Sequence, residues 1–151
     1  MARSSQLPNM RSSYRLDPEI GAALAPLAAN TADAPPIARG DWMALRERAN
    51  TNLAFLGTLN PPVSDDVRTR SFLITVDDGT DLAARWYSRG DEQPGSAVVY
   101  AHGGGMIAGN LDLYDAVIAE YVVATGVPFL SVDYRLAPEA QGTRPARDVF
   151  P

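Results

Sequence analysis

Apolar residues recur at helical spacing in two N-terminal segments, residues 16–30 and 41–56. An aspartate stands at the start of each segment, Asp17 in the first and Asp41 in the second, where a carboxylate caps free backbone N–H groups. Pro26 interrupts the first segment. Because proline lacks a backbone N–H, we expect this helix to kink or stop near Pro26 and to end by residue 30.

The pattern then changes to that of strands. Residues 72–76 and 82–87 are short runs rich in strand-forming side chains, and they flank a glycine-containing turn at residues 77–80. This arrangement predicts an antiparallel hairpin.

A strand–helix–strand unit follows the hairpin. Residues 97–101 and 127–132 are continuous apolar runs, which predict buried strands. Residues 111–125 lie between them and repeat at helical spacing, and Gly126 fits the C-terminal stop of that helix. Such a unit predicts two parallel strands joined by a right-handed crossover.

Composition excludes several classes of protein. The chain has 151 residues, of which 46% are hydrophobic, and a formal net charge of −5, so no basic stripe is present to bind nucleic acid. It contains no cysteine, which excludes disulfides, thiolate nucleophiles and cysteine zinc sites. No apolar run reaches the roughly eighteen residues that a membrane span needs. We therefore expect a cytoplasmic protein with no membrane partner.

Three adjacent glycines, Gly103, Gly104 and Gly105, come directly after His102 and the apolar run 97–101. Glycines at the end of a buried strand allow the backbone to approach a ligand and to direct N–H groups at it. Such donors stabilise the negative charge that develops on oxygen during acyl transfer. A tight turn that needs positive φ is the purely structural alternative.

The same glycines also fit a degenerate dinucleotide-binding fingerprint, in which Gly103, Gly105 and Ala108 hold the required positions. That fingerprint needs an acidic residue about twenty positions further on, to bind the ribose hydroxyls. The first acid after the next strand, Asp133, lies thirty positions after Gly103. The spacing disfavours nucleotide binding but leaves it as an alternative.

His102 is the single histidine, and so the one side chain whose ordinary pKa suits proton transfer near neutrality. Its place beside the glycines favours a role in shaping the loop through hydrogen bonds over a role as general base. None of the candidate serines stands in the Gly-x-Ser-x-Gly elbow that exposes a nucleophile. These serines are Ser71, Ser88, Ser96 and Ser131.

Charged residues cluster after the second apolar run. Asp133, Arg135 and Glu139 predict a structural ion pair, of Arg135 with either Glu139 or Asp133, that fixes the turn. Earlier in the chain, Asp112 and Asp115 are candidate caps for the helix that begins near residue 111.

Several of these motifs together resemble the hormone-sensitive-lipase-like branch of the α/β-hydrolase fold. They are His-Gly-Gly-Gly-Met at 102–106, Gly-Asn-Leu-Asp-Leu-Tyr-Asp at 109–115 and Ser-Val-Asp-Tyr-Arg-Leu-Ala-Pro-Glu at 131–139. Leu-Asp-Pro-Glu-Ile at 16–20 is similar to the start of that family's N-terminal cap helices. The resemblance covers residues 16–150.

The resemblance implies a carboxylic-ester hydrolase that acts on short- to medium-chain acyl esters without a metal or an organic cofactor. It places the oxyanion-hole donors on the backbone N–H groups of Gly104 and Gly105, and it gives His102 and Gly103 the shaping of that loop. It implies the N-terminal half of an α/β-hydrolase: a mostly parallel sheet whose first strands form an antiparallel hairpin, with cap helices over an apolar acyl pocket.

The family's nucleophile elbow and the other two triad residues have no counterpart in this sequence. We therefore expect a flexible arm at 1–15, cap helices and a linker at 16–65, and a partial hydrolase core at 66–151 that is truncated before the elbow. The chain alone is predicted to be inactive. By the family's strand order the run 97–101 has an open edge, which predicts self-association. A non-catalytic binding or assembly module is the second hypothesis.

Overall fold

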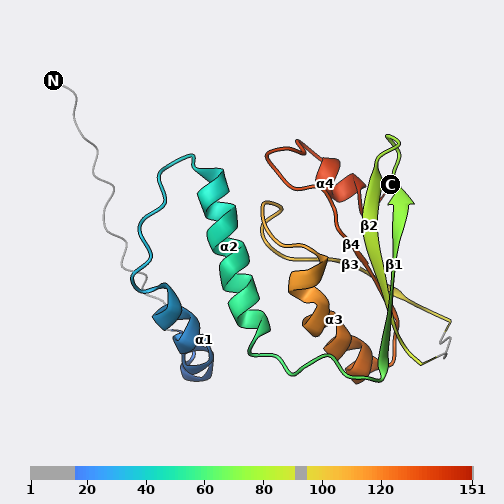
Figure 1. The fold of residues 1–151 in the computed structure, drawn as a ribbon, viewed down its shortest axis with the longest axis horizontal. Coiled ribbons are helices and arrows are strands. Elements are labelled where there is room, and N and C mark those ends of the chain that lie inside the picture. The colour runs from blue at the N-terminus through green and yellow to red at the C-terminus, as the bar shows by residue number, and fades with distance from the viewer. Residues whose placement is uncertain (1–15, 91–94, 151) are drawn as a thin grey trace. The chain divides into compact units, whose positions relative to one another are not determined.

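The computed structural model describes residues 16–90 and 95–150, and it divides the chain into two units with the boundary after Pro35. The first unit contains helix α1, Pro18–Thr31. The second unit contains all the other elements drawn in Figure 1. The arm predicted at 1–15 lies outside the described residues.

Helix α1 begins where the sequence predicts. The Asp17 carboxylate accepts hydrogen bonds from the backbone N–H groups of Glu19 at 2.9 Å and Ile20 at 3.4 Å. Of the two outcomes predicted at Pro26, a kink or a stop, the stop does not occur: the helix continues through Pro26 and ends at Thr31, one residue past the predicted limit. Its sequence is rich in alanine, the strongest helix former, which offsets the loss of one backbone hydrogen bond at the proline.

Helix α2, Trp42–Gly57, is also capped as predicted, since the Asp41 carboxylate accepts from the Ala44 N–H at 3.0 Å. The apolar side chains at its start do not become core residues. Met43 is 65% exposed and Leu45 is 43% exposed. Two polar side chains of the same helix, Arg46 and Asn50, hydrogen-bond to the connections that follow the strands, as described below.

The predicted hairpin is confirmed. Strand β1, Val67–Thr75, pairs in antiparallel register with β2, Asp81–Arg89. At the turn, the Asp78 carboxylate accepts from the Thr80 N–H at 3.1 Å, and Gly79 has a φ of +82°. This left-handed conformation explains why a glycine stands in the turn.

The other two strands are short and complete a sheet of order β1-β2-β4-β3. Strand β3, Val98–Ala101, pairs in parallel with β4, Phe129–Val132, and β4 pairs in antiparallel with β2. The prediction that β3 is buried is wrong: Val98 is 38% exposed and Val99 is 46% exposed. The reason is that β3 lies at the edge of the described sheet and has a strand neighbour on one side.

Helix α3, Leu111–Thr125, has the predicted bounds and covers one face of the sheet (Figure 1). Gly126 ends it with a φ of +69°, as predicted. The core between α3 and the sheet consists of Val67, Tyr87, Ile118, Ala119, Val122 and Phe129. Each large apolar side chain buried there contributes about 1.5–3 kcal/mol.

The cap of α3 differs from the prediction. Asn110, not Asp112 or Asp115, accepts a hydrogen bond from the Leu113 N–H, at 2.9 Å. The two aspartates instead bind Arg85 of β2, which holds α3 against the sheet.

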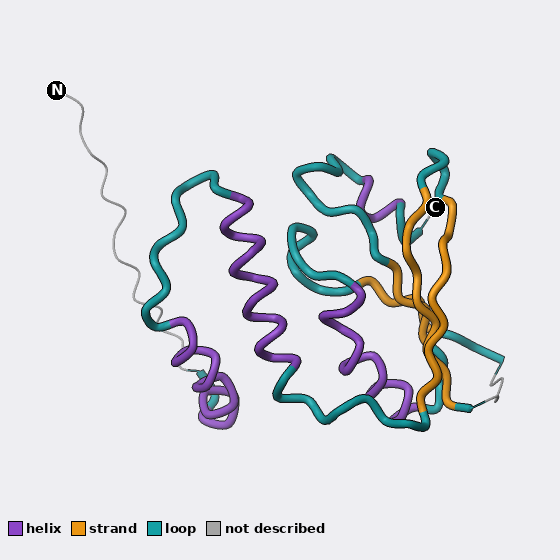
Figure 2. Tube along the Cα trace, in the orientation of Figure 1, coloured by secondary structure: helices purple, strands orange, loops and turns teal. Residues whose placement is uncertain are grey.

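Two long connections leave the sheet: residues 102–110 lead from β3 to α3, and residues 133–143 lead from β4 to the short helix α4, Arg144–Arg147 (Figure 2). A hydrogen bond of 2.8 Å from the Ala137 N–H to the Met106 oxygen joins them. Among the residues described, no helix is long and apolar enough to cross a lipid bilayer.

Candidate functional site

The connection between β3 and α3 turns sharply at Gly104. Its φ is +124°, and its carbonyl oxygen accepts hydrogen bonds from the N–H groups of Ile107 at 3.2 Å and Ala108 at 3.1 Å. A Cβ at Gly104 would lie 2.0 Å from the Ala108 oxygen. Both the left-handed backbone and this close approach require glycine.

The backbone N–H groups of Gly104 and Gly105 donate to no acceptor within residues 16–90 and 95–150. Gly105, with a φ of +63°, and Met106, with a φ of +61°, continue the left-handed turn. Successive N–H groups in such turns form concavities that bind anions. The turn follows the carboxyl end of β3, which is where open α/β sheets bind ligands. It can therefore accept a negatively charged oxygen.

The ring of His102 lies beneath this turn and is 3% exposed. Its Nδ1 lies 2.9 Å from the Gly103 oxygen, so Nδ1–H donates to that carbonyl in the neutral ring. Nε2 has no hydrogen-bond partner among the described residues and lies 3.9 Å from Asp133 Oδ1. The histidine thus faces the loop backbone, and no serine hydroxyl contacts it among the described hydrogen bonds.

Two tyrosines support His102, and sequence reasoning did not single them out. The ring of Tyr134 stacks on His102 with centroids 4.4 Å apart, and its hydroxyl donates to the His102 carbonyl at 2.7 Å. The ring of Tyr114 stacks at 5.6 Å. Burial raises the pKa of both tyrosines, which keeps their hydroxyls protonated and able to donate.

The predicted ion pair of Arg135 with Glu139 or Asp133 is wrong. Arg135 binds the fully buried Asp148 at 2.5 Å and Asp78 of the hairpin turn at 2.8 Å. Glu139 binds Arg46 of α2 through both carboxylate oxygens, at 2.8 and 2.6 Å. Ion-pair partners that lie far apart in the sequence cannot be recognised from local spacing. The prediction therefore paired Arg135 with a nearby carboxylate, which is not its partner.

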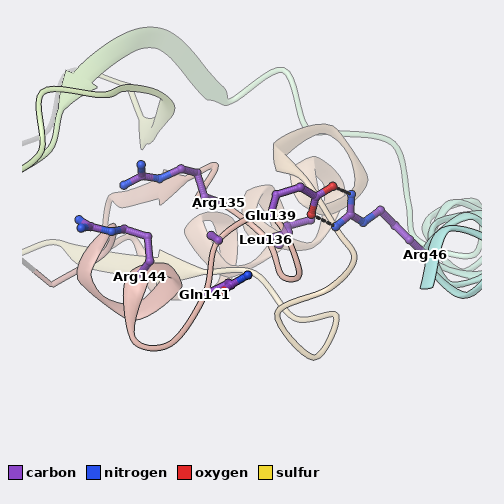
Figure 3. Close-up of a pocket in the computed structure, with 7 residues that line it drawn as sticks. Arg46, Arg135, Leu136, Glu139, Gln141 and Arg144 are labelled. Atoms are coloured by element: carbon purple, nitrogen blue, oxygen red, sulfur yellow. Dashed lines mark hydrogen bonds and ion pairs between the residues drawn. The ribbon is translucent and has the colours of Figure 1, made fainter. Parts of the chain in front are cut away.

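A cavity of about 520 Å³ lies beside the Arg46–Glu139 pair (Figure 3). Each of its three arginines is paired with a carboxylate. Its lining residues are Arg46, Arg135, Leu136, Glu139, Ala140, Gln141 and Arg144. The glycines of the turn are not among them, so this cavity is separate from the two unpaired N–H groups.

Two of the four candidate serines are held in structural positions. Ser131 is completely buried in β4, and the Ser71 hydroxyl accepts from Arg85 at 3.2 Å. Within the same residues, no group of three or more His, Cys, Asp or Glu side chains could hold a metal ion.

The geometry also disfavours the dinucleotide alternative. Helix α3 begins at Leu111, well after Gly105, and the Asn110 side chain occupies its N-terminus. In a dinucleotide fold the pyrophosphate lies against that N-terminus, directly after the glycines.

Comparison with known proteins defines the class. The family described as "alpha/beta hydrolase fold" matches residues 98–150. The chain is similar to the hyperthermophilic esterase of Pyrobaculum calidifontis, with a TM-score of 0.73 and 29% identity over 89% of this chain and 41% of that one. The predicted fold class is confirmed: the chain has the fold of the N-terminal part of an α/β-hydrolase.

Within that class, the predicted resemblance to esterases of the hormone-sensitive-lipase type is confirmed. The chain is 26% identical to the hormone-sensitive lipase of Bos taurus over 89% of its own length and 16% of that protein. It is 39% identical to an ethyl acetate hydrolase of Pseudomonas putida over 44% of its length and 22% of that protein. The chain thus spans about a fifth of these curated relatives and about two fifths of the solved structure.

Proposed function

We propose that this chain carries the oxyanion-stabilising part of a carboxylic-ester hydrolase. The observation that supports it is the pair of adjacent N–H groups, Gly104 and Gly105, at the carboxyl end of β3, for which the described part of the chain holds no acceptor. In ester hydrolysis the carbonyl oxygen of the substrate becomes negatively charged in the tetrahedral intermediate. Losing one donor to that oxygen typically costs about 10²–10³ in turnover.

The remaining site residues position this pair of donors. His102 and Gly103 shape the turn through the Nδ1–H to carbonyl hydrogen bond. Asp133, Arg135 and Glu139 act structurally: the last two form ion pairs at hydrogen-bond distance, and Asp133 directly follows β4, with its Oδ1 3.9 Å from His102 Nε2.

The nucleophile and its base come from residues outside this chain. The sequence contains no Gly-x-Ser-x-Gly elbow, and the single histidine faces the Gly103 carbonyl. The 151-residue chain alone is therefore inactive. Among the relatives, an ethyl acetate hydrolase and acetyl esterases support a small acyl ester as the substrate. Residues 16–65, which include α1 and α2, would act as cap helices and linker.

Hydrolysis of p-nitrophenyl acetate tests the proposal. The 151-residue chain and a form extended in frame past codon 151 would be assayed side by side. We expect turnover from the extended form only. Turnover by the 151-residue chain would contradict the placement of the nucleophile, and a lack of turnover by both forms would contradict the esterase function.

Assembly through strand β3 is the second candidate function. Its exposed Val98 and Val99 and its single strand partner make it a template for pairing with another chain. Sedimentation velocity of the 151-residue chain is expected to give a dimer or larger species, which Val99→Lys converts to monomer. The control is Leu73→Lys on the opposite edge strand β1, where Leu73 is 67% exposed. A monomeric parent chain would exclude this function.

A further inference from the structure

Helix α2 directs two polar side chains, one turn apart, at the glycine turn. Arg46 Nε donates to the Ile107 carbonyl at 2.6 Å, and Asn50 Oδ1 accepts from the Gly109 N–H at 2.8 Å. One contact satisfies a carbonyl and the other an N–H, on either side of Ala108. The helix therefore binds the segment whose backbone closes the turn at Gly104.

The same guanidinium also binds the second connection. Nη2 of Arg46 donates to the Ala137 carbonyl at 2.7 Å. Nη1 and Nη2 donate to the two oxygens of the Glu139 carboxylate, at 2.8 and 2.6 Å (Figure 3). The Ala137 N–H in turn donates to the Met106 carbonyl at 2.8 Å. One side chain thus joins α2, the glycine turn and the connection after β4.

The Arg46 side chain is itself held in place. Its guanidinium carbon lies 4.8 Å from the centre of the Trp42 ring, one helical turn earlier, and its side chain is 23% exposed. Three of its nitrogens are used, in a planar geometry that a lysine ammonium cannot reproduce.

We propose that Arg46 is a positioning residue, which holds residues 104–108 so that the Gly104 and Gly105 N–H groups converge on one point. This role deepens the proposed oxyanion function and rests on it. Within the described residues these N–H groups have no partner to fix their direction, so the order of the turn depends on its carbonyls. The Gly104 carbonyl accepts from Ile107 and Ala108, and Arg46 fixes the Ile107 carbonyl from outside the turn. Asn50 assists at Gly109. Preorganised donors of this kind need such external support to keep their direction.

Three protected N–H groups report on this turn in the 151-residue chain. The Ile107 and Ala108 N–H groups donate to the Gly104 carbonyl, and the Ala137 N–H donates to that of Met106. Amide hydrogen exchange, followed residue by residue by NMR, measures how often each bond opens. In Arg46→Met and Arg46→Lys we expect these three amides to exchange about tenfold faster, with amides of α3 within about twofold of the parent chain.

The matched control is Arg144→Met. Arg144 is also ion-paired and partly exposed, but its partners Asp77, at 2.7 Å, and Asp78, at 3.4 Å, lie in the hairpin turn. We expect no selective change at the three amides in this variant. Glu139→Gln is the milder second variant, because it keeps the two Arg46 contacts to carbonyl oxygens, and it carries the test if Arg46→Met does not fold. In it we expect faster exchange at the same amides by about threefold.

Three results would overturn the proposal: unchanged exchange at the three amides in the Arg46 variants, an equal acceleration at all amides, or full protection in Arg46→Lys. The exchange measurement needs no catalysis. The positioning role of Arg46 can therefore be contradicted while ester hydrolysis is observed, or supported while no hydrolysis is observed.

A kinetic measurement addresses the positioning role directly. In an extended form that hydrolyses p-nitrophenyl acetate, Arg46→Lys is expected to lower kcat by about tenfold or more with little change in KM, because donors that lose their direction weaken transition-state binding. A change in KM alone would contradict positioning.

Discussion

The connections that follow β3 and β4 are joined by a hydrogen bond, yet their polar groups are satisfied in opposite ways. In the connection after β3, the N–H groups of Gly104 and Gly105 find no acceptor among the described residues. In the connection after β4, Arg135 and Glu139 each form ion pairs at 2.8 Å or less, Arg135 with Asp148 and Asp78 and Glu139 with Arg46. The first connection leaves two donors available for a ligand, whereas the charged side chains of the second are paired within the protein.

We call the connection at residues 102–110 the presenting segment, because it offers donors, and the connection at residues 133–143 the supporting segment. Unsatisfied donors are tolerated in the first because the turn is short, partly exposed and built from glycine. The second is fixed to the hairpin turn by Arg135 and to α2 by Glu139. The Ala137 N–H donates to the Met106 carbonyl, so the fixed supporting segment restrains the position of the glycine turn.

Breaking the supporting segment should have the largest effect on stability. Asp148 is fully buried and accepts from the Arg135 guanidinium and from the Arg135 backbone N–H at 2.9 Å. These bonds also hold the pKa of Asp148 below its ordinary value. Asp148→Asn removes a buried acceptor of these bonds while Arg135 keeps Asp78, and we expect a loss of about 1–3 kcal/mol in the free energy of unfolding, measured by urea denaturation.

The control for that loss is an exposed ion pair. Asp66 lies 3.7 Å from Arg89, and its side chain is 64% exposed. Asp66→Asn is expected to cost less than about 1 kcal/mol. Equal losses in the two variants would mean that burial of Asp148 does not decide its contribution.

Breaking the presenting segment should instead act on catalysis. A methyl group at Gly104 would collide with the Ala108 carbonyl and distort the turn. In an extended form that hydrolyses p-nitrophenyl acetate, we expect Gly104→Ala to lower kcat by about 10²–10³. Gly142→Ala is the control, because Gly142 also has a positive φ, +63°, and lies outside the turn. A similar loss of kcat in both variants would contradict the proposed role of Gly104.

Local features were predictable from the sequence. The caps at Asp17 and Asp41, the hairpin and the bounds of α3 follow from residue spacing and from turn chemistry over a few positions. For strand β3 the sequence supported two predictions. Its apolar run predicted a buried strand, because such a run looks the same at a sheet's edge as in its centre, whereas the family's strand order predicted the open edge that the described sheet shows. Burial depends on neighbours that one segment does not specify.

Long-range pairs were not predictable. Glu139 binds Arg46 and Arg135 binds Asp78, across separations that spacing rules do not reach. A partial signal for Arg46 and Asn50 did exist, because these two polar residues stand one turn apart on the same side of α2 as Trp42. An arginine beside a tryptophan on one helix side indicates a distant partner without identifying it.

Acidic conditions are expected to weaken the ion pair between Arg46 and Glu139, which supports the presenting segment. The hydrogen bond from Arg46 lowers the pKa of Glu139 to about 2 from an ordinary value of 4.5. A lowered pKa means that the pair stabilises the fold fully above about pH 4.5 and loses this contribution as the pH falls toward 2. In Glu139→Gln, the urea midpoint should therefore depend less on pH between 5 and 3 than in the parent chain. Parallel pH curves for the two proteins would contradict this assignment.

The smallest expected effect lies where the presenting segment ends and α3 begins. Asn110 Oδ1 caps the helix by accepting from the Leu113 N–H, whereas the neighbouring Asp112 is 79% exposed and binds Arg85. Asn110→Ala is therefore expected to cost about 1 kcal/mol of unfolding free energy, and Asp112→Asn only a few tenths, in urea denaturation. The reverse order would mean that Asp112 caps the helix in solution. The residue that caps α3 directly after the glycine turn would then be Asp112 and not Asn110.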